Sequence, residues 1–569
     1  MYKRCLCFPL ILFLSLLLLA GCTAENSVIP PAGETTAAPV AEDIILAADG
    51  QALFTLLRPE IATDEEIALT VSLRKTAGSL LGSMPDIETD WRIPKGLYEP
   101  AEFEILIGQT EVEESKAVYE SLPYNSYTLR VVGDKLVAAC WRDEAYPLLE
   151  DMLRELLTSH TENGVCTIPA DYSDTRAFSE DLNDIPHYDG YVRRVVDLDD
   201  GSYMLYVEKA QLADMEAYCA ILRDAGYILY TEHTAADNHF ATYMGDGRSI
   251  HVYYTACYRT LRIVIDPKGT YRAPRAEDVP LYEKITEPQV SMIGLNNTGN
   301  ENNAIGLFMA FLLPNGEFIV VDGGFTIPDA HDYVYRRLRE LAPDPDNIVI
   351  AAWYLTHAHS DHTPAFYNFV TRHHMDIPIR QVVLNFTRSD RYDLRENSTT
   401  EVATRTILKL LPETAVVKAH TGQVFHYPGA SVEMLFTFDD YLPRELPYVN
   451  ATSLIFRVSL GGQTVMVLGD ASEHITTMAC RMYGSYLKSD IVQMSHHGGD
   501  GATSELYTLI DPHTALWPAG ETKYRQNLER ACNRTLLQLA EDLYVARYDV
   551  ITLVLPYTPV GNNPHRTAP

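Results

Sequence analysis

Short apolar runs separated by turn residues fill the chain from residue 288 to 560 and predict alternating strands and helices. The runs 308–313 and 318–321 are separated by a Pro-Asn-Gly turn, so we predict two strands joined as a hairpin. A helix is predicted from Asp329 to Leu341, followed by a buried strand over 348–355. Elements in this order are typical of an α/β scaffold.

Residue types that bind metals follow three of the predicted strands. The strand 348–355 runs into His357-Ala358-His359-Ser360-Asp361-His362. The strands 464–468 and 491–494 end in Gly469-Asp470 and in His496-His497-Gly498. A Gly-Asp turn or a His-His pair alone is common on protein surfaces, but in this order the motifs reinforce one another. Loops at strand ends are where an α/β scaffold usually carries its chemistry.

The first motif has the residue types and the spacing of a metal site. Imidazole and carboxylate groups are the usual ligands of zinc and similar divalent ions. Because side chains two positions apart on an extended segment point the same way, His357 and His359 can hold one ion. Asp361 and His362 can reach a second ion from the following turn, and Asp470 is the candidate bridging carboxylate. A polar surface loop is the simpler alternative.

Residues 288–560 resemble the metallo-β-lactamase superfamily. The motifs that carry the resemblance are Asp322-Gly323-Gly324, His357-Ala358-His359-Ser360-Asp361-His362, Gly469-Asp470 and His496-His497-Gly498. The subgroup that the chain resembles most is the hydrolase domain of the competence DNA-uptake protein ComEC. That subgroup carries an Asn-x-x-Ser strand before the Gly-Asp and His-His-Gly motifs, matched here by Asn450-Ala451-Thr452-Ser453. The resemblance includes none of the membrane channel of the competence protein.

The resemblance implies an α/β fold, namely an αβ/βα sandwich with a metal site at one edge. The metal ligands that it implies are His357, His359, Asp361, His362, Asp470 and His496. The first two would hold one metal, the next two the other, and Asp470 would bridge them. One histidine of the last motif completes the second site, and we favour His496 over His497.

The chain departs from the lactamases themselves, because no glycine-histidine pair stands where their third ligand histidine would be. His420 and His426 lie in this interval, but they flank a turn before a predicted strand and we interpret them as surface residues. Asn450 occupies the plausible position instead. We therefore expect the first metal to be bound weakly or to be absent. The departure disfavours antibiotic hydrolysis and favours the phosphodiesterase-like branches.

The expected ligands indicate hydrolytic chemistry. A divalent ion lowers the pKa of bound water towards about 7, so that hydroxide is available at neutral pH. A pair of ions can hold this nucleophile and the substrate oxygen together. The candidate catalytic residues are Asp361, Asp470 and Asn450, and Asp470 can also orient the water. Since no cysteine is among the ligands, we expect one or two Zn²⁺ ions, with Mn²⁺ as the alternative.

The first 22 residues predict a lipoprotein signal peptide. Lys3 and Arg4 precede an apolar run over 10–19 that is too short to span a membrane durably. Leu19-Ala20-Gly21-Cys22 resembles a bacterial lipobox, which implies cleavage before Cys22 and a lipid on its thiol. Residues 23–42, rich in Pro, Thr and Ala, indicate a flexible linker. We expect a body that is anchored to the cell membrane by lipid, outside the cytoplasm.

Two small modules are predicted before the hydrolase-like domain. Residues 43–170 alternate strands and helices, and Thr63 with Glu66 predicts a capping box at the start of a helix towards Leu81. Residues 187–268 predict an α+β module after a polar linker over 171–186. We assign no ligand to either module.

The formal net charge is −32, which disfavours broad electrostatic binding of nucleic acid without excluding a local basic patch. A small-molecule or surface ester substrate fits this charge better. Six cysteines remain beyond Cys22; Cys140 and Cys166 are the pair to examine for a disulfide, although unpaired core thiols are the expected state.

Two classes of function remain open. The first is a metal-dependent hydrolase of phosphodiester or related ester bonds that acts outside the cytoplasm. The second is a binding or sensing lipoprotein whose metallohydrolase fold is catalytically weak or inactive, as the missing third histidine would suggest. We favour the enzyme, because all the other motif positions are present. Within that class the sequence leaves nuclease, phospholipid-headgroup esterase and lactamase open.

Overall fold

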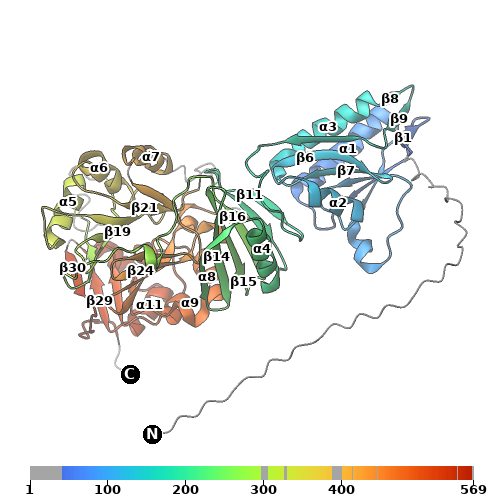
Figure 1. The fold of residues 1–569 in the computed structure, drawn as a ribbon. Helices are drawn as coiled ribbons and strands as arrows, with labels where there is room; N and C mark the ends of the chain where they lie inside the picture. The colour runs from blue at the N-terminus through green and yellow to red at the C-terminus, as the bar shows by residue number, and fades with distance from the viewer. Residues whose placement is uncertain are drawn as a thin grey trace, which may run out of the picture.

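A computed structural model describes residues 42–295, 306–325, 330–387 and 400–566, apart from residues 413, 445 and 548. The expected signal peptide with Cys22, and the linker up to residue 41, lie outside the described residues. Figure 1 shows three successive parts, with the sheet of residues 194–265 between the first module and the carboxyl-terminal domain. Among the helices described, none is both long and apolar enough to cross a bilayer.

The first module is built on two sheets, of six and four strands. The six-stranded sheet has the order β10-β6-β7-β5-β3-β4, and the four-stranded sheet has the order β2-β1-β9-β8. The elements are β1 (Ile44–Ala48), β2 (Gln51–Ala52), β3 (Thr55–Arg58), α1 (Asp64–Leu81), β4 (Asp86–Thr89), β5 (Glu104–Ile107), α2 (Glu113–Ser121), β6 (Ser126–Val132), β7 (Lys135–Cys140), α3 (Tyr146–Ser159), β8 (Thr161–Glu162), β9 (Val165–Ile168) and β10 (Ser173–Ala177). The predicted capping box is confirmed, since the Glu66 amide donates to Thr63 Oγ1 (3.1 Å) and the Thr63 amide donates to Glu66 Oε2 (2.7 Å).

The predicted linker 171–186 is partly wrong. Its first residues form β10, which pairs antiparallel with β6 and extends the first module to Ala177. Cys140 on β7 and Cys166 on β9 are both buried and unbonded, and the other four described cysteines are also free thiols.

The middle module is one antiparallel sheet with a single helix on it. The strand order is β11-β12-β16-β15-β14-β13. Its elements are β11 (Arg194–Asp197), β12 (Tyr203–Val207), α4 (Leu212–Asp224), β13 (Ile228–Ala235), β14 (Asn238–Gly245), β15 (Arg248–Thr255) and β16 (Thr260–Ile265). Side chains such as Val252 and Ile263 pack under Tyr218 of α4, whereas Phe240, Tyr253 and Val264 join the core of the carboxyl-terminal domain. Because side chains alternate between the two faces of a strand, one face of this sheet packs under α4 and the other packs on the carboxyl-terminal domain.

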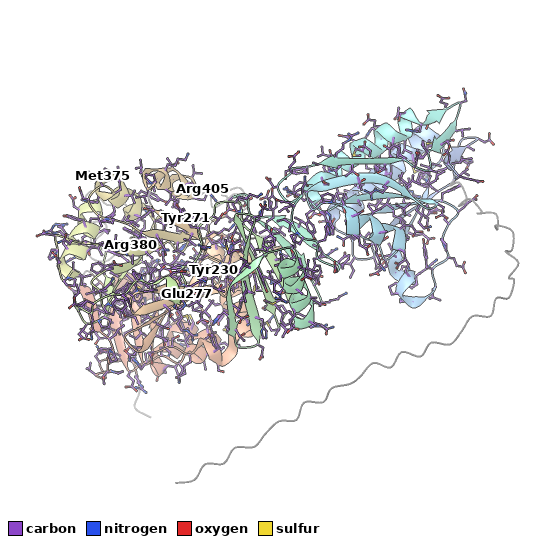
Figure 2. All side chains as sticks on the ribbon, viewed as in Figure 1. Tyr230, Tyr271, Glu277, Met375, Arg380 and Arg405 are labelled. Atoms are coloured by element: carbon purple, nitrogen blue, oxygen red, sulfur yellow. The ribbon has the colours of Figure 1, made fainter. Side chains whose placement is uncertain are left out.

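The segment between the middle module and the last domain is held against the structure. The Tyr230 hydroxyl donates to the Ala273 carbonyl (3.0 Å) and to Asp278 Oδ2 (3.1 Å). In Figure 2, Tyr230, Tyr271 and Glu277 lie together beside the sheet of the middle module. These contacts fix the path by which the chain enters the third part.

The carboxyl-terminal domain is an αβ/βα sandwich of two seven-stranded sheets. The strand orders are β22-β21-β20-β19-β18-β17-β30 and β23-β24-β25-β26-β27-β28-β29. The first sheet and its helices comprise β17 (Gln289–Ile293), β18 (Phe308–Leu312), β19 (Phe318–Asp322), α5 (Ala330–Leu341), β20 (Ile350–Tyr354), α6 (Pro364–His373), β21 (Gln381–Leu384), α7 (Thr400–Ile407), β22 (Ala415–Lys418) and β30 (Val550–Val554). The second comprises β23 (Val424–Tyr427), β24 (Ala430–Phe436), β25 (Ile455–Leu460), β26 (Gln463–Val467), α8 (Glu473–Tyr483), β27 (Ile491–Gln493), α9 (Ser504–Ile510), β28 (Thr514–Trp517), α10 (Glu521–Asn527), α11 (Ala531–Leu539) and β29 (Asp542–Val545).

Alternate strand residues form the two kinds of core that this sandwich needs. Phe311 and Val321 of the first sheet meet Phe456 and Val467 of the second in a buried layer between the sheets. Residues of opposite parity pack under the helices, for example Trp353 against Phe366 and Phe369 of α6. Figure 1 shows α5, α6 and α7 outside one sheet and α8, α9 and α11 outside the other. The predicted strands and the helix over 329–341 are confirmed to within a few residues.

The parallel strands bring the three polar motifs to one edge. β19 and β20 are parallel, and so are β26, β27 and β28. The first metal-ligand motif follows β20, Gly469-Asp470 follows β26, and His496-His497 follows β27. Since parallel strands end at the same edge of a sheet, the motifs meet in space although more than a hundred residues separate the first motif from the other two.

Candidate metal centre

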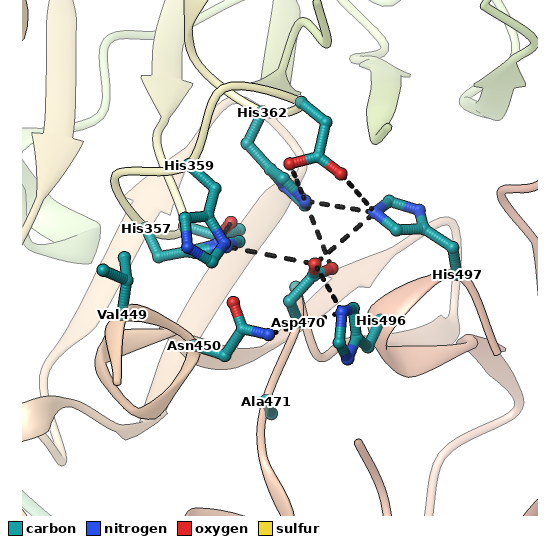
Figure 3. A network of polar contacts seen from close by, with 12 residues as sticks. His357, His359, His362, Val449, Asn450, Asp470, Ala471, His496 and His497 are labelled. Carbon is teal, nitrogen blue, oxygen red and sulfur yellow. Dashed lines mark hydrogen bonds and ion pairs between the residues drawn. The ribbon is translucent and has the colours of Figure 1, made fainter. Parts of the chain in front are cut away.

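Seven side chains from three loops converge at this edge of the sandwich. Figure 3 shows His357 and His359 on one side of Asp470 and His496 and His497 on the other, with His362 next to His497. The ligand atoms form two sets, and within each set all of them lie within 4.8 Å of one another. The first set is His357, His359 and Asp470, and the second set is Asp361, His362, Asp470 and His497. Asp470 belongs to both sets, so it occupies the place of a bridging carboxylate.

The second set is the more compact of the two. His497 Nε2 lies 3.2 Å from Asp361 Oδ2, 3.4 Å from Asp470 Oδ2 and 3.3 Å from His362 Nε2. His362 Nε2 lies 3.2 Å from Asp470 Oδ1. These nitrogen and oxygen atoms surround one point, as the ligands of a single ion do.

The first set is looser and more open. His357 Nε2 lies 3.1 Å from His359 Nδ1 and 3.9 Å from Asp470 Oδ2. His357 and Asp470 are buried, whereas His359 is half-buried. An ion bound here would have two histidines and one shared carboxylate as protein ligands.

Asp322 orients His362 from behind. Its Oδ2 lies 2.8 Å from His362 Nδ1, which leaves Nε2 pointing at the cluster. The carboxylate also accepts hydrogen bonds from the Thr356 amide (2.8 Å) and the Thr356 hydroxyl (2.7 Å). A carboxylate behind a histidine fixes the ring's tautomer and orientation in many metal sites. Asp322 was named in the sequence analysis only as part of the Asp322-Gly323-Gly324 motif, and this role was not predicted.

The His-His pair is aimed by an unusual backbone. His496 and His497 have φ values of 50° and 53°, in the left-handed region that residues other than glycine rarely adopt. The His496 amide donates to the Gly469 carbonyl (3.1 Å), and Trp517 Nε1 donates to the His497 carbonyl (2.8 Å). At Gly498 a side chain would overlap the Trp517 ring, which explains the glycine of this motif.

The geometry favours His497 over His496, which was preferred in the sequence analysis. His497 is 4% exposed, lies in the second set, and has its Nδ1 3.0 Å from the Pro518 carbonyl, which frees Nε2 for an ion. The His496 side chain is 33% exposed, and its Nε2 lies 3.8 Å from Asp470 Oδ2 and 3.4 Å from Asn450 Nδ2. The two residues are adjacent and chemically identical, so only their backbone conformation separates their roles.

Asn450, which was expected in the place of the third ligand, lies next to His496 at the site. It is 6% exposed, and its Oδ1 has no hydrogen-bond partner among the described residues. Its Nδ2 faces His496 rather than the first set. A buried amide oxygen without a donor is costly unless a ligand or water satisfies it.

His420 was wrongly interpreted as a surface residue. It is fully buried, with its Nδ1 2.9 Å from Asp439 Oδ2 and its Nε2 3.0 Å from Asp266 Oδ1. Asp266 directly follows β16 of the middle module, so packing of this module covers the turn. His420 therefore joins two parts of the chain and belongs to neither ligand set. His426 is half-buried on β23.

The carboxylates in and around the second set favour positive charge at this position. Burial alone would lower the pKa of His362, but the Asp470, Asp322 and Asp361 carboxylates hold it well above its usual value. Burial likewise opposes protonation of His497, and Asp470 and Asp361 nonetheless raise its pKa to about 9. At His357 the pKa lies well below its usual value, because of burial and the neighbouring His362 and His359.

These residues fit a divalent metal ion. Three carboxylates, those of Asp322, Asp361 and Asp470, lie around the imidazoles of His362 and His497. The Nδ1 atoms of these two imidazoles face Asp322 Oδ2 and the Pro518 carbonyl. Asp470 Oδ1 is buried and lies 3.2 Å from His362 Nε2. A bound cation would take the place of the protons on His362 and His497 and would satisfy that oxygen. In the absence of thiolates, the ligands suit zinc and manganese, and imidazole also suits iron.

The geometry predicts unequal effects at the adjacent histidines. We expect His497→Ala to weaken binding of the more tightly held zinc ion by about tenfold to 100-fold, the range reported for removal of groups around a metal. His496→Ala should weaken it much less, because the His496 side chain lies outside the second set. Competition with a zinc-chelating dye would measure both. Equal losses in the two variants would contradict this assignment.

Comparisons with known proteins found solved structures of low similarity, and the roles of the residues are therefore argued from the chain itself. No protein-family model matches the chain, and no curated protein matches it. Similar solved structures include the diiron β-hydroxylase CmlA from Streptomyces venezuelae (12% identity, 48% of this chain and 55% of that chain, TM-score 0.28) and a mutant of CmlA (14%, 48% and 55%, 0.29). A flavo di-iron protein mutant from Thermotoga maritima is 11% identical over 56% of this chain and 57% of that chain, with a TM-score of 0.20. The chain thus spans little more than half the length of these proteins.

Proposed function

We propose that the chain is a metal-dependent hydrolase of the metallo-β-lactamase superfamily that cleaves phosphodiester or related ester bonds. The observation that carries this proposal is the sharing of Asp470 by two adjacent sets of histidine and aspartate ligands. Sites of this kind recur where water attacks a phosphoryl or carbonyl centre. The ComEC-like motif set supports the phosphodiester class over the lactams.

The roles of the side chains follow from their positions. The second set, Asp361, His362, Asp470 and His497, would hold one ion, and His357 and His359 with Asp470 would hold the other. An ion bound there would lower the pKa of water and polarise the substrate oxygen. Asp470 would bridge the two ions and orient the attacking water. Asn450, whose amide lies beside His496, positions the substrate on the open side of the site.

The substrate is expected to be small or displayed on a surface. A formal charge of −32 repels the extended phosphate backbone of nucleic acids, whereas one ester group carries little charge. Zinc is the first choice of metal, with manganese and iron as alternatives. Because the negative charge of the protein disfavours a polyanionic substrate, a small phosphodiester is the first substrate to assay.

Hydrolysis of bis(p-nitrophenyl) phosphate by residues 23–569 tests the proposal. We expect turnover that requires added zinc, manganese or iron and that falls strongly in His359→Ala, which removes a ligand of the first set. His239→Ala is the matched control, because His239 lies on β14 of the middle module, and it should keep wild-type turnover. Metal binding without turnover of any ester would favour the alternative, a binding or sensing lipoprotein.

We also propose that the protein is a lipoprotein attached through Cys22. The support is the lipobox-like sequence Leu19-Ala20-Gly21-Cys22 after an apolar segment. Expressed in a bacterial host, the full chain should incorporate labelled palmitate and sediment with membranes. Cys22→Ala should abolish the label, and unchanged labelling of this variant would contradict lipidation at Cys22.

A further inference from the structure

A pocket of about 380 Å³ lies where the middle module meets the carboxyl-terminal domain. On one side it is lined by the ends of β12 and β16, and on the other by residues 440–444 and Met478 of α8. None of its lining residues belongs to either set of metal ligands. Its size is that of a site for a small molecule.

The pocket gathers positive charge in a strongly acidic protein. Its lining includes Lys209, Arg259, Arg262 and Arg444. The Arg259 guanidinium donates to the Lys209 carbonyl (3.5 Å), and the Arg444 guanidinium faces the sulfur of Met478 (3.6 Å). Within the described part of the chain, no carboxylate forms an ion pair with any of these four side chains.

Two carboxylates, Asp440 and Glu208, also line the pocket, and the four cations outnumber them. Asp440 accepts hydrogen bonds from the hydroxyls of Thr421 and Tyr253. Burial raises its pKa to about 6, although the positive charge of Arg262 opposes this shift. Glu208 is exposed at the rim. The cations therefore remain available to an anion from solution.

Arg262 is a buried cation in the lining of this pocket. It is 4% exposed, and its guanidinium donates to Thr260 Oγ1 (2.9 Å) and to the Asp440 carbonyl (2.8 Å), which are neutral acceptors. Its Nε has no hydrogen-bond partner among the described residues. The Asp440 carboxylate offsets part of this buried charge, and an anion in the pocket would supply the acceptor that Arg262 Nε lacks.

We propose that this pocket binds a small phosphate monoester through its phosphate group. Guanidinium groups present donors that match the oxygens of phosphate, and a dianionic group suits several converging cations. The rings of Tyr206, Tyr258 and Tyr441 also line the pocket and offer apolar walls to the organic part of the ligand. The proposal is independent of the hydrolase assignment, because it uses none of the metal ligands.

Calorimetric titration of residues 23–569 with phenyl phosphate, inorganic phosphate and phenol tests the proposal. EDTA in the buffer keeps metal ions from competing for phosphate. Phenyl phosphate should bind saturably, inorganic phosphate more weakly, and phenol not at all. The double variant Arg259→Gln/Arg444→Gln should lose about tenfold or more in affinity, since each substitution removes a charged donor at an exposed position.

Two controls make the outcome decisive. Lys75→Gln/Arg336→Gln removes the same charge from exposed positions on α1 and α5 and should leave the affinity unchanged. Asp470→Ala should also bind as the wild type does. No saturable binding of either phosphate, equal affinity in the Arg259/Arg444 variant, or loss of binding in Asp470→Ala would overturn the proposal.

Discussion

Replacement of Asp470 by alanine is expected to lower hydrolysis of a phosphodiester by more than about 100-fold. Groups that only orient metal ligands already change affinity or activity by about 10-fold to 100-fold, and Asp470 is itself shared by both ligand sets. The carboxylate is 1% exposed and within 3.4 Å of both His362 Nε2 and His497 Nε2. Its loss should also lower the number of bound ions measured by elemental analysis.

Asp470→Asn separates this chemical role from packing. It keeps the volume of the side chain and removes its charge, so we expect a similar loss of activity with an unchanged circular dichroism spectrum. His239→Ala again serves as the control that keeps activity. Full turnover in Asp470→Asn would contradict the role of this carboxylate at the metal centre.

The second large effect is expected at His420, and it concerns stability. Removing its imidazole would leave Asp266 and Asp439 as buried carboxylates without the cation between them. Loss of one member of a buried ionic group typically costs about 3–5 kcal/mol. We therefore expect His420→Gln to lower the free energy of unfolding by about this amount near pH 6.5.

The effect of His420 should depend on pH in a defined direction. Burial alone would lower its pKa, but Asp266 and Asp439 raise it from 6.5 to about 9. A raised pKa means that the folded chain holds the proton more tightly, so this stabilisation is complete below pH 6.5 and is lost as pH rises through about 9. The change corresponds to up to about 3 kcal/mol, at about 1.36 kcal/mol per pKa unit.

Comparison of two variants isolates this contribution. Denaturant unfolding of the wild type and of His420→Gln should differ most near pH 6.5, and the difference should shrink above pH 9. His426→Gln, on the half-buried strand β23, is the matched control and should show little change. A difference that is constant across this pH range would show that His420 acts through packing rather than charge.

The sequence predicted most of the sandwich because its strands are buried on both faces. Continuous apolar runs such as 308–313 and 348–355 are what a strand between a second sheet and a helix layer requires. The capping box of Thr63 and Glu66 was equally readable, since its two hydrogen bonds join residues three apart. Local signals of these kinds are present in the sequence itself.

The strand β10 was missed because it carries no such signal. Ser173–Ala177 is an edge strand whose side chains are mostly exposed, so its polar composition resembles that of a linker. An edge strand is stabilised by backbone hydrogen bonds to its neighbour, here β6, and these leave no trace in side-chain polarity.

The sequence indicated which residues form the site, but it did not indicate how each side chain is placed. The ligand residue types stand together in the sequence, but the choice between His496 and His497 depends on a left-handed backbone and on the distant Pro518 carbonyl. His420 was misplaced for a similar reason, because its burial comes from Asp266 and the middle module. Contacts between segments far apart in the chain decided both outcomes.

The central claim is that the two ligand sets form a metal centre, and anomalous diffraction from zinc tests it most directly. Crystals of residues 23–569 grown with zinc should show an anomalous peak among Asp361, His362, Asp470 and His497. A second peak of lower occupancy is expected beside His357 and His359. Crystals in which zinc binds only elsewhere on the protein, or not at all, would contradict the account.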